Sequence, residues 1–159
     1  MSQVFPGRYT AQIEGPFVVF LIGMRINRLL AVRKWVPVVK AMPGMLSELY
    51  KNPESGFLGA QLFLNWRGVS VAQYWRSFEH LHDYAHARDA LHLPAWTAFN
   101  RAVGGDGSVG IWHETYAIQP GNFECVYANM PRFGLAQASD HLPVTGRTDS
   151  AKARIKAQT

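Results

Sequence analysis

The order of the apolar segments constrains the fold of this chain more than any other feature. Residues 17–26 form an apolar run with two valines and two phenylalanines, which predicts a buried strand. Residues 29–50 carry apolar side chains at intervals of three and four, which predicts a helix. Pro43 and Gly44 interrupt this pattern, so we expect the helix to break there and a short second helix to follow.

The next segments predict a hairpin and further helices. Two strand-like runs, 57–65 and 69–75, are separated by only three residues, which is typical of a hairpin with a short loop. Ser77 is a suitable N-cap for the helix that follows. Another helix is expected over 91–103, where Pro94 fits the first turn.

Strand-like segments close the series and define a fold class. Residues 109–118 predict another strand, and residues 123–129 predict a short extra strand. Residues 134–138 are expected to form at most one turn of helix. The order strand, helix, strand, strand, helix pair, strand is that of the split βαβ unit, which predicts an α+β, ferredoxin-like fold with an antiparallel sheet. Helices cover one face of such a sheet, so something else must bury the other. We expect a second copy to do so, as a homodimer packed sheet to sheet.

The composition fits one folded domain with more aromatic mass than a small core needs. Of 159 residues, 48% are hydrophobic, 13% aromatic and only 17% charged, against about 25% charged in ordinary globular chains. This balance excludes a wholly disordered chain. We expect an irregular N-terminal arm over 1–15, the ferredoxin-like domain over 16–130, and a partly irregular C-terminal extension over 131–159.

The net charge of +5 comes largely from the C-terminus. Residues 147–156 hold four Lys or Arg and one Asp, and we expect a solvated, frayed end there. The rest shows no basic stripe suited to phosphates, so no nucleic-acid partner is expected. Cys125 is the single cysteine and cannot form an internal disulfide. The longest uncharged apolar run, 17–24, is too short to span a bilayer, so we expect a cytoplasmic protein with no membrane span.

Histidines gather between positions 80 and 113. His82 and His86 share one helix face, and without a third ligand the expected role is a partly exposed face rather than a zinc site. His92 opens an apolar stripe that continues through Trp96 and Phe99. That position fits either a core histidine bonded to a backbone carbonyl or an axial ligand of haem iron.

A second candidate histidine lies in the middle of the strand predicted over 109–118. Alternation places His113 on the same face as Thr115, and Glu114 on the opposite face. A mid-strand histidine and glutamate are costly to bury unpaired. Either the two belong to a polar pocket, or one of them lies in the dimer interface.

Two arginines lie at the ends of predicted strands. Arg25 lies at the end of the first predicted strand, where it is either an ordinary surface residue or lies at the mouth of a pocket. Arg76 follows Trp75 at a strand-to-helix junction, where free N–H groups favour an anion. The sequence contains no Gly-rich phosphate loop, no Gly-x-Ser-x-Gly elbow and no paired-cysteine metal motif.

Several short motifs resemble a bacterial and fungal family of small, largely uncharacterised proteins that are often labelled monooxygenase-like. The resemblance covers about residues 10–145 and implies the dimeric α+β barrel fold, in agreement with the segment order. It implies no particular reaction. The motifs are Gly23-Met24-Arg25-Ile26-Asn27, Met42-Pro43-Gly44-Met45-Leu46, Tyr74-Trp75-Arg76-Ser77, Trp112-His113-Glu114-Thr115-Tyr116 and Tyr127-Ala128-Asn129-Met130-Pro131.

The chain is also distantly similar to two haem enzymes, aldoxime dehydratase and spheroidene monooxygenase. The matching residues are Tyr74-Trp75, Tyr84-Ala85 and His92. This similarity implies that His92 is an axial haem ligand, although its spacing from Ala85 differs from that in the dehydratase. The distal residues of the dehydratase have no counterpart here, so dehydration of aldoximes is not implied.

Three functions are compatible with these residues. The leading one is a haem-binding, monooxygenase-like or dehydratase-like enzyme acting on a hydrophobic small molecule between sheet and helices. One alternative is a cofactor-free oxygenase of the antibiotic-biosynthesis type, with His113 or His92 as general base. The other is a non-enzymatic dimer that binds a small molecule. The candidate residues are His113, Arg25 and Trp75 for catalysis, His92 for the metal, and Trp96, Phe99 and Arg76 for the rest of the haem site.

Overall fold

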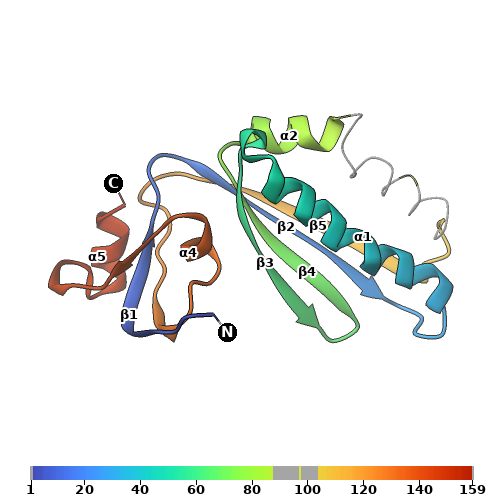
Figure 1. Cartoon of the computed structure of the whole chain (residues 1–159), viewed down its shortest axis with the longest axis horizontal. Helices are drawn as coiled ribbons and strands as arrows, with labels where there is room; N and C mark the ends of the chain where they lie inside the picture. The colour runs from blue at the N-terminus through green and yellow to red at the C-terminus, as the bar shows by residue number, and fades with distance from the viewer. Residues whose placement is uncertain (1, 88–96, 98–103, 159) are drawn as a thin grey trace.

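A computed structural model of the chain describes residues 2–87, 97 and 104–158. Its strands form two antiparallel sheets (Figure 1), one of four strands in the order β3-β4-β2-β5 and one of three in the order β6-β1-β7. We call the first the helix-backed sheet, because α1 lies across it, and the second the terminal sheet, because the two ends of the chain supply its strands.

The helix-backed sheet has the strand order of a ferredoxin-like fold. It consists of β2 (Phe17–Ile26), β3 (Phe57–Asn65), β4 (Gly68–Trp75) and β5 (Val109–Ile118), with β4 and β2 in the centre. The α+β, antiparallel fold class predicted from the segment order is therefore confirmed, and the bounds of β2 and β5 agree with the predicted runs.

Within the described ranges, two helices accompany this sheet, α1 (Val32–Lys51) and α2 (Phe78–His86). The predicted break at Pro43 and Gly44 is wrong, since α1 runs through both residues without interruption. Apolar side chains pack on the sheet before and after this point, and their burial outweighs the backbone hydrogen bond that proline removes. The predicted N-cap of α2 is confirmed, because the Ser77 side chain accepts a hydrogen bond from the His80 N–H.

The contacts of α1 identify which side chains face the helices. Trp75 and Val18 pack with Leu49 of α1, and Met24 and Val109 pack with apolar residues of the first half of α1. Even-numbered residues of β2 and odd-numbered residues of β4 and β5 therefore point to the helices. We call this the helix-facing side. The predicted helix over 91–103 lies outside the described residues except for Thr97, which is helical.

The N-terminal residues are ordered in the terminal sheet, contrary to the prediction from the sequence. We expected 1–15 to be an irregular arm, but β1 (Phe5–Gln12) is the central strand here, between β6 (Tyr127–Met130) and β7 (Asp140–Pro143). β1 is held as a strand by its hydrogen bonds to strands more than a hundred residues away in the sequence. No local sequence pattern reveals such pairing. Short helical segments complete the region: α4 (Leu135–Ala138), the predicted single turn, α5 (Ala151–Lys156) and a 3-10 turn, η2 (Gly146–Thr148). A second 3-10 turn, η1 (Pro53–Ser55), precedes β3.

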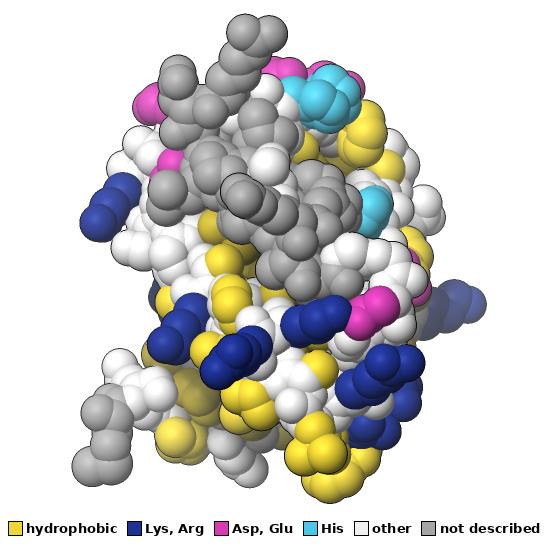
Figure 2. Space-filling view, turned by 90° about the vertical axis from the view of Figure 1, so that its right-hand side faces the viewer, with side chains coloured by type: hydrophobic (Ala, Val, Ile, Leu, Met, Phe, Trp, Pro, Cys, Tyr) yellow, Lys and Arg dark blue, Asp and Glu magenta, His cyan; other side chains and the backbone are white. Residues whose placement is uncertain are grey.

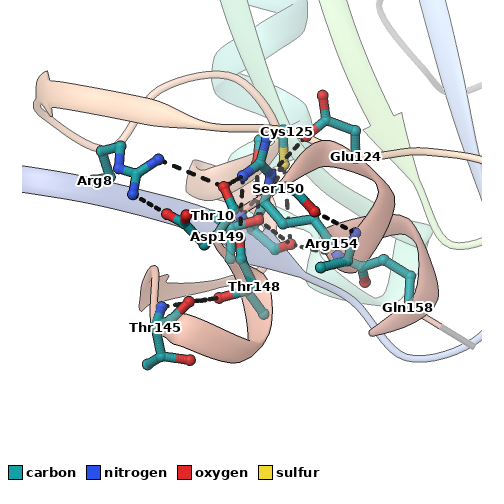
Figure 3. Close-up of polar contacts among 12 residues, drawn as sticks. Arg8, Thr10, Glu124, Cys125, Thr145, Thr148, Asp149, Ser150, Arg154 and Gln158 are labelled. Carbon is teal, nitrogen blue, oxygen red and sulfur yellow. Dashed lines mark hydrogen bonds and ion pairs between the residues drawn. The ribbon is translucent and has the colours of Figure 1, made fainter.

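The C-terminus is packed rather than frayed, which is a second correction. Arg154 is only 6% exposed, and its Nε donates to the Glu124 carboxylate at 2.7 Å (Figure 3). The same guanidinium donates to the carbonyls of Thr148 and Asp149. Gln158 donates to the Ala11 carbonyl at 2.8 Å, which joins the end of the chain to β1.

The two sheets meet on the face opposite the helices. Phe17, Val19 and Tyr74 of the helix-backed sheet pack with Leu135 and Ala136 of α4. The chain therefore covers part of this face itself, whereas we expected a second copy to cover it. Other residues there stay exposed, among them Phe63, Trp112 and Tyr116. Among the described residues, no helix has the length and apolar character needed to cross a membrane.

Candidate functional site

His113 lies on the helix-facing side of β5, an edge strand of the helix-backed sheet. Its neighbour across the ladder is Ile22, and Thr115 lies opposite Phe20. The rings of His113 and Phe20 have centroids 5.6 Å apart. His113 is exposed, and its ring nitrogens have no hydrogen-bond partner within the described ranges. The strand therefore presents an imidazole next to an aromatic ring, without a structural bond that occupies it.

A buried polar side chain lies on the same side of the sheet. Gln73 of β4 faces Phe20 across the ladder, so Gln73, Phe20 and Thr115 form one row over three strands. The Gln73 Oε1 accepts a hydrogen bond from the Trp75 indole N–H at 3.0 Å, which satisfies one polar atom of each residue. The row thus combines an apolar centre with a polar group at either end.

Trp75, a predicted catalytic residue, lies in the packed core. It is 0% exposed, and its ring contacts those of Phe57 at 5.4 Å and Tyr84 at 5.6 Å. Its indole N–H is already bound to Gln73. The structure therefore gives Trp75 a packing role and a contact that orients Gln73.

The two arginines predicted to serve the site do not converge on His113. Arg25 is an odd-numbered residue of β2, so it points to the face opposite the helices. Arg76 follows β4 at the other end of the sheet, is exposed, and donates its backbone N–H to the Gly56 carbonyl at 2.8 Å. His92, Trp96 and Phe99, the predicted haem-contacting residues, lie outside the described residues. His113 is therefore the one predicted site residue among those described that combines the helix-facing side with exposure.

A separate pocket of about 470 Å³ lies between the end of α1, η1 and α2. Three carboxylates line it, those of Glu48, Glu54 and Asp83, together with His80. The Tyr84 hydroxyl donates to Glu48 at 3.1 Å, and burial followed by the charge of Glu48 raises the pKa of Tyr84 well above its ordinary value. Haem carries two propionates that need cations, and no Lys or Arg is among the described residues that line this pocket. The described lining therefore does not fit haem.

The remaining described histidines have other surroundings. His82 and His86 stack on the exposed face of α2, with ring centroids 4.1 Å apart. His141 packs in the terminal sheet against Tyr9. Within the part of the chain that the structure describes, no three His, Cys, Asp or Glu side chains are grouped for a metal ion.

Phe20 and Gln73 are not among the site residues predicted from the sequence. A signal for Gln73 was present, because strand alternation puts it on the same side as Val71 and Trp75, where a polar side chain is unexpected. Phe20 had no such signal. Its position beside His113 depends on the register between β2 and β5, which the pattern of either strand alone does not contain.

Comparison with solved structures finds small proteins of similar topology. They include SnoaB, a cofactor-independent oxygenase from Streptomyces nogalater (12% identity, TM-score 0.46, covering 65% of this chain and 93% of that one). A putative antibiotic biosynthesis monooxygenase from Caulobacter crescentus matches with 14% identity and TM-score 0.47, covering 64% and 89%. A dimeric protein of unknown function with a ferredoxin-like fold from Bacteroides fragilis matches with 11% identity and TM-score 0.45, covering 63% and 96%.

Sequence comparison identifies a nearer relative and a family. Monooxygenase af470 of Aspergillus fumigatus is 30% identical in an alignment 154 positions long, which covers 81% of this chain and 53% of that protein. The chain therefore spans about half the length of its curated relative. A family model matches residues 17–135, from β2 through the first residue of α4. The chain therefore belongs to the monooxygenase af470-like family.

Proposed function

We propose that this protein is a cofactor-free oxygenase for a hydrophobic, electron-rich aromatic molecule, with His113 as its general base. The observation that carries the proposal is the exposed imidazole of His113 beside Phe20 on the helix-facing side of the sheet. A histidine whose ring nitrogens carry no structural bond is free to accept a proton from a bound molecule. Membership of a monooxygenase-like family supports oxygen chemistry as the reaction class.

The residues of the row support substrate positioning. Phe20 offers a ring on which an aromatic substrate stacks, next to His113. Thr115 and Gln73 supply polar groups on either side of Phe20. Gln73 is held by its bond from Trp75, so its side chain is oriented before a ligand arrives.

The chemistry balances without a further reductant. For a substrate with an acidified CH₂ next to a ketone-bearing aromatic system, His113 takes one C–H proton, and the resulting carbanion transfers one electron to O₂. The two radicals combine to form a C–O bond, and the histidinium returns its proton to the terminal oxygen. Loss of the second C–H proton to the base and cleavage of the O–O bond then give a ketone and water. One atom of O₂ enters the product, the other becomes water, and the substrate supplies all the electrons.

Oxygen uptake with anthrone as the probe tests this proposal. We expect the wild-type protein to consume O₂ faster than buffer, and His113→Ala and His113→Gln to lose about a hundredfold or more of that excess, the range for a general base. His82→Ala is the matched control, because His82 is exposed on α2 and should leave the rate unchanged. Full activity in His113→Ala would contradict the assignment of the base.

The haem-dependent alternative is tested on the same preparations. It depends on His92 as axial ligand, and added hemin would then give a Soret band that His92→Ala removes. We expect no such band, and oxygen uptake that is independent of hemin. A Soret band sensitive to His92→Ala, together with hemin-dependent turnover, would contradict the proposed function and favour a haem-dependent enzyme.

The proposed assembly is a homodimer through the part of the sheet face that the terminal sheet leaves open. Trp112 lies there with its indole against Gly23, and Tyr116 is exposed on the same face, four residues further along β5. We expect Trp112→Ser to weaken the dimer, as measured by light scattering, and Trp66→Ser to leave it unchanged. A wild-type monomer at micromolar concentration would contradict the proposed dimer.

A further inference from the structure

One end of the helix-backed sheet carries large apolar side chains in water. Leu30, in the loop between β2 and α1, is 97% exposed, and Trp66, in the turn between β3 and β4, is 92% exposed. Leu64 is 82% exposed just before that turn, and Leu29 is also exposed. Single exposed apolar residues are ordinary on protein surfaces. Leu29, Leu30 and Trp66 on two adjoining loops, with Leu64 at the end of β3, form an apolar tip that the packing of this chain does not explain.

The two loops of the apolar tip are bonded to each other and to the body of the protein. The Arg67 carbonyl accepts from the Ile26 N–H at 2.7 Å, and the Arg67 guanidinium donates to the Asn27 carbonyl at 2.7 Å. The Leu29 carbonyl accepts from the Trp35 indole N–H at 3.0 Å. The backbone is therefore held in place while Leu30 and Trp66 project from it.

Cations surround the apolar tip, and few of the described residues near it are acidic. Residues 17–47 and 57–78, which include both of its loops, contain no Asp or Glu. They contribute the exposed Arg25, Arg28 and Arg33. Asp106 is an acidic residue bonded to this region, and its carboxylate forms an ion pair with the Lys34 Nζ at 2.5 Å. Figure 2 looks at this end of the molecule and shows Lys and Arg side chains around exposed apolar ones over its lower half.

We propose that the apolar tip is a docking site for the surface of an anionic lipid bilayer. Leucines and a tryptophan that project from fixed loops suit the boundary between headgroups and acyl chains, where Trp is favoured. Cations beside them suit negatively charged headgroups. A nucleic acid would leave Leu30 and Leu64 in water, so it fits the charge of the tip but not its apolar side chains. Docking would place the proposed enzyme where hydrophobic molecules accumulate, but it does not depend on the proposed reaction.

Sedimentation of the 159-residue chain with lipid vesicles tests the proposal. We expect binding to vesicles of phosphatidylcholine with phosphatidylserine, little binding to phosphatidylcholine alone, and release by high salt. Arg28→Ala and Arg33→Ala should each weaken binding about fivefold, the effect of removing one cation from an anionic surface. Leu30→Ser with Trp66→Ser should reduce binding further at every salt concentration.

Matched controls separate docking from general effects. Lys152→Glu alters a charge on α5 in the terminal region, and Val4→Ser alters an exposed apolar residue near the N-terminus. Both should bind like the wild type, and thermal unfolding should show that all variants are folded. Brominated lipids should quench tryptophan fluorescence in the wild type, and less in Trp66→Phe.

Several results would overturn the proposal. Failure of the wild type to bind anionic vesicles would do so, as would equal weakening by Lys152→Glu. Binding to an oligonucleotide that is as strong as vesicle binding and insensitive to Leu30→Ser would assign the tip to nucleic acid instead. Because vesicle binding is measured without substrate, its failure is distinguishable from failure of the oxygen-uptake test.

Discussion

The two sheets of this protein are held together by different interactions. The helix-backed sheet rests on apolar packing, with Trp75, Val18 and Leu49 forming a core between strands and helix. The terminal sheet has a small apolar cluster and is joined by polar contacts between distant residues, such as Arg154 with Glu124 and Gln158 with the Ala11 carbonyl. Removal of one contact should therefore affect the two regions in different ways.

This difference has a consequence for the order of unfolding. Apolar packing is shared among many contacts, so its loss lowers the stability of a whole cluster. A buried charged pair depends on both partners, and loss of one leaves the other without compensation. We expect the terminal sheet to open below the free energy of global unfolding, and the helix-backed sheet to open only with the whole chain.

The largest expected effect is that of Trp75→Ala in the core of the helix-backed sheet. Truncation of a fully buried tryptophan leaves a large cavity and removes the hydrogen-bond donor of the Gln73 side-chain oxygen. We therefore expect a loss of about 3–5 kcal/mol in the free energy of unfolding. Urea denaturation measures it. Trp66→Ala is the matched control, since that ring is exposed and its loss should cost less than about 0.5 kcal/mol. Similar losses in both variants would contradict the packing role of Trp75.

Arg154→Ala should have the second largest effect, and a local one. It removes the donor of the Glu124 carboxylate and of the Thr148 carbonyl, and the shorter of two bonds to the Asp149 carbonyl, which should cost about 2–3 kcal/mol in the terminal sheet. Hydrogen exchange should then speed up in β1 and α5 but not in β2. Arg8→Ala removes an exposed pair with Asp149 and should cost less than about 1 kcal/mol. Equal acceleration in β2 would show that the two regions unfold as one unit.

The same contrast explains how much of the structure the sequence predicted. The helix-backed sheet is encoded locally, because its strands are short runs rich in apolar, β-branched and aromatic residues that turn residues separate. β2, β5 and the hairpin were predicted for this reason. α1 was predicted in extent but not in continuity, since packing on both sides of Pro43 outweighs the local break.

The terminal sheet was not predicted, because its evidence is distributed over the whole chain. β1 carries Pro6 and Gly7, which locally indicate an irregular segment, and it pairs with strands from the other end of the sequence. The candidate site lies between these extremes. Alternation within β5 predicted which residues share the sheet face of His113. It did not predict that Phe20 lies next to His113, because that contact depends on the register between β2 and β5.

A smaller effect is expected from the two helix caps, one in each region. The side chains of Ser77 and Ser150 accept hydrogen bonds from the backbone N–H groups of His80 and Ala153. Substitution by alanine should cost about 1 kcal/mol at either site. We expect Ser77→Ala to lower the global stability by that amount in urea denaturation. Ser150→Ala should instead speed hydrogen exchange in α5 while the global transition moves little, and a full global shift there would contradict separate opening of the terminal sheet.

The smallest expected effect is a pH dependence confined to the terminal sheet. The His141 ring stacks on Tyr9 with centroids 4.5 Å apart, and its Nε2 is buried without a partner among the described residues. Burial first, and then the charge of Arg132, lower the pKa of His141 below its ordinary value. The unfolded state therefore binds a proton at a higher pH than the folded state does, so stability falls as the pH drops below about 6.5 and stops falling below the folded pKa.

Hydrogen exchange of β7 measures this effect between about pH 8 and about pH 5, after correction for the intrinsic rate. We expect protection to decrease on acidification in the wild type and to stay constant in His141→Phe, which keeps an aromatic ring against Tyr9 but cannot take up a proton. His82→Ala is the control, because His82 is exposed on α2 and its removal should leave the β7 response intact. A decrease that persists in His141→Phe would assign the acid sensitivity to another group. An equal decrease of protection in β2 would mean that the two sheets open together.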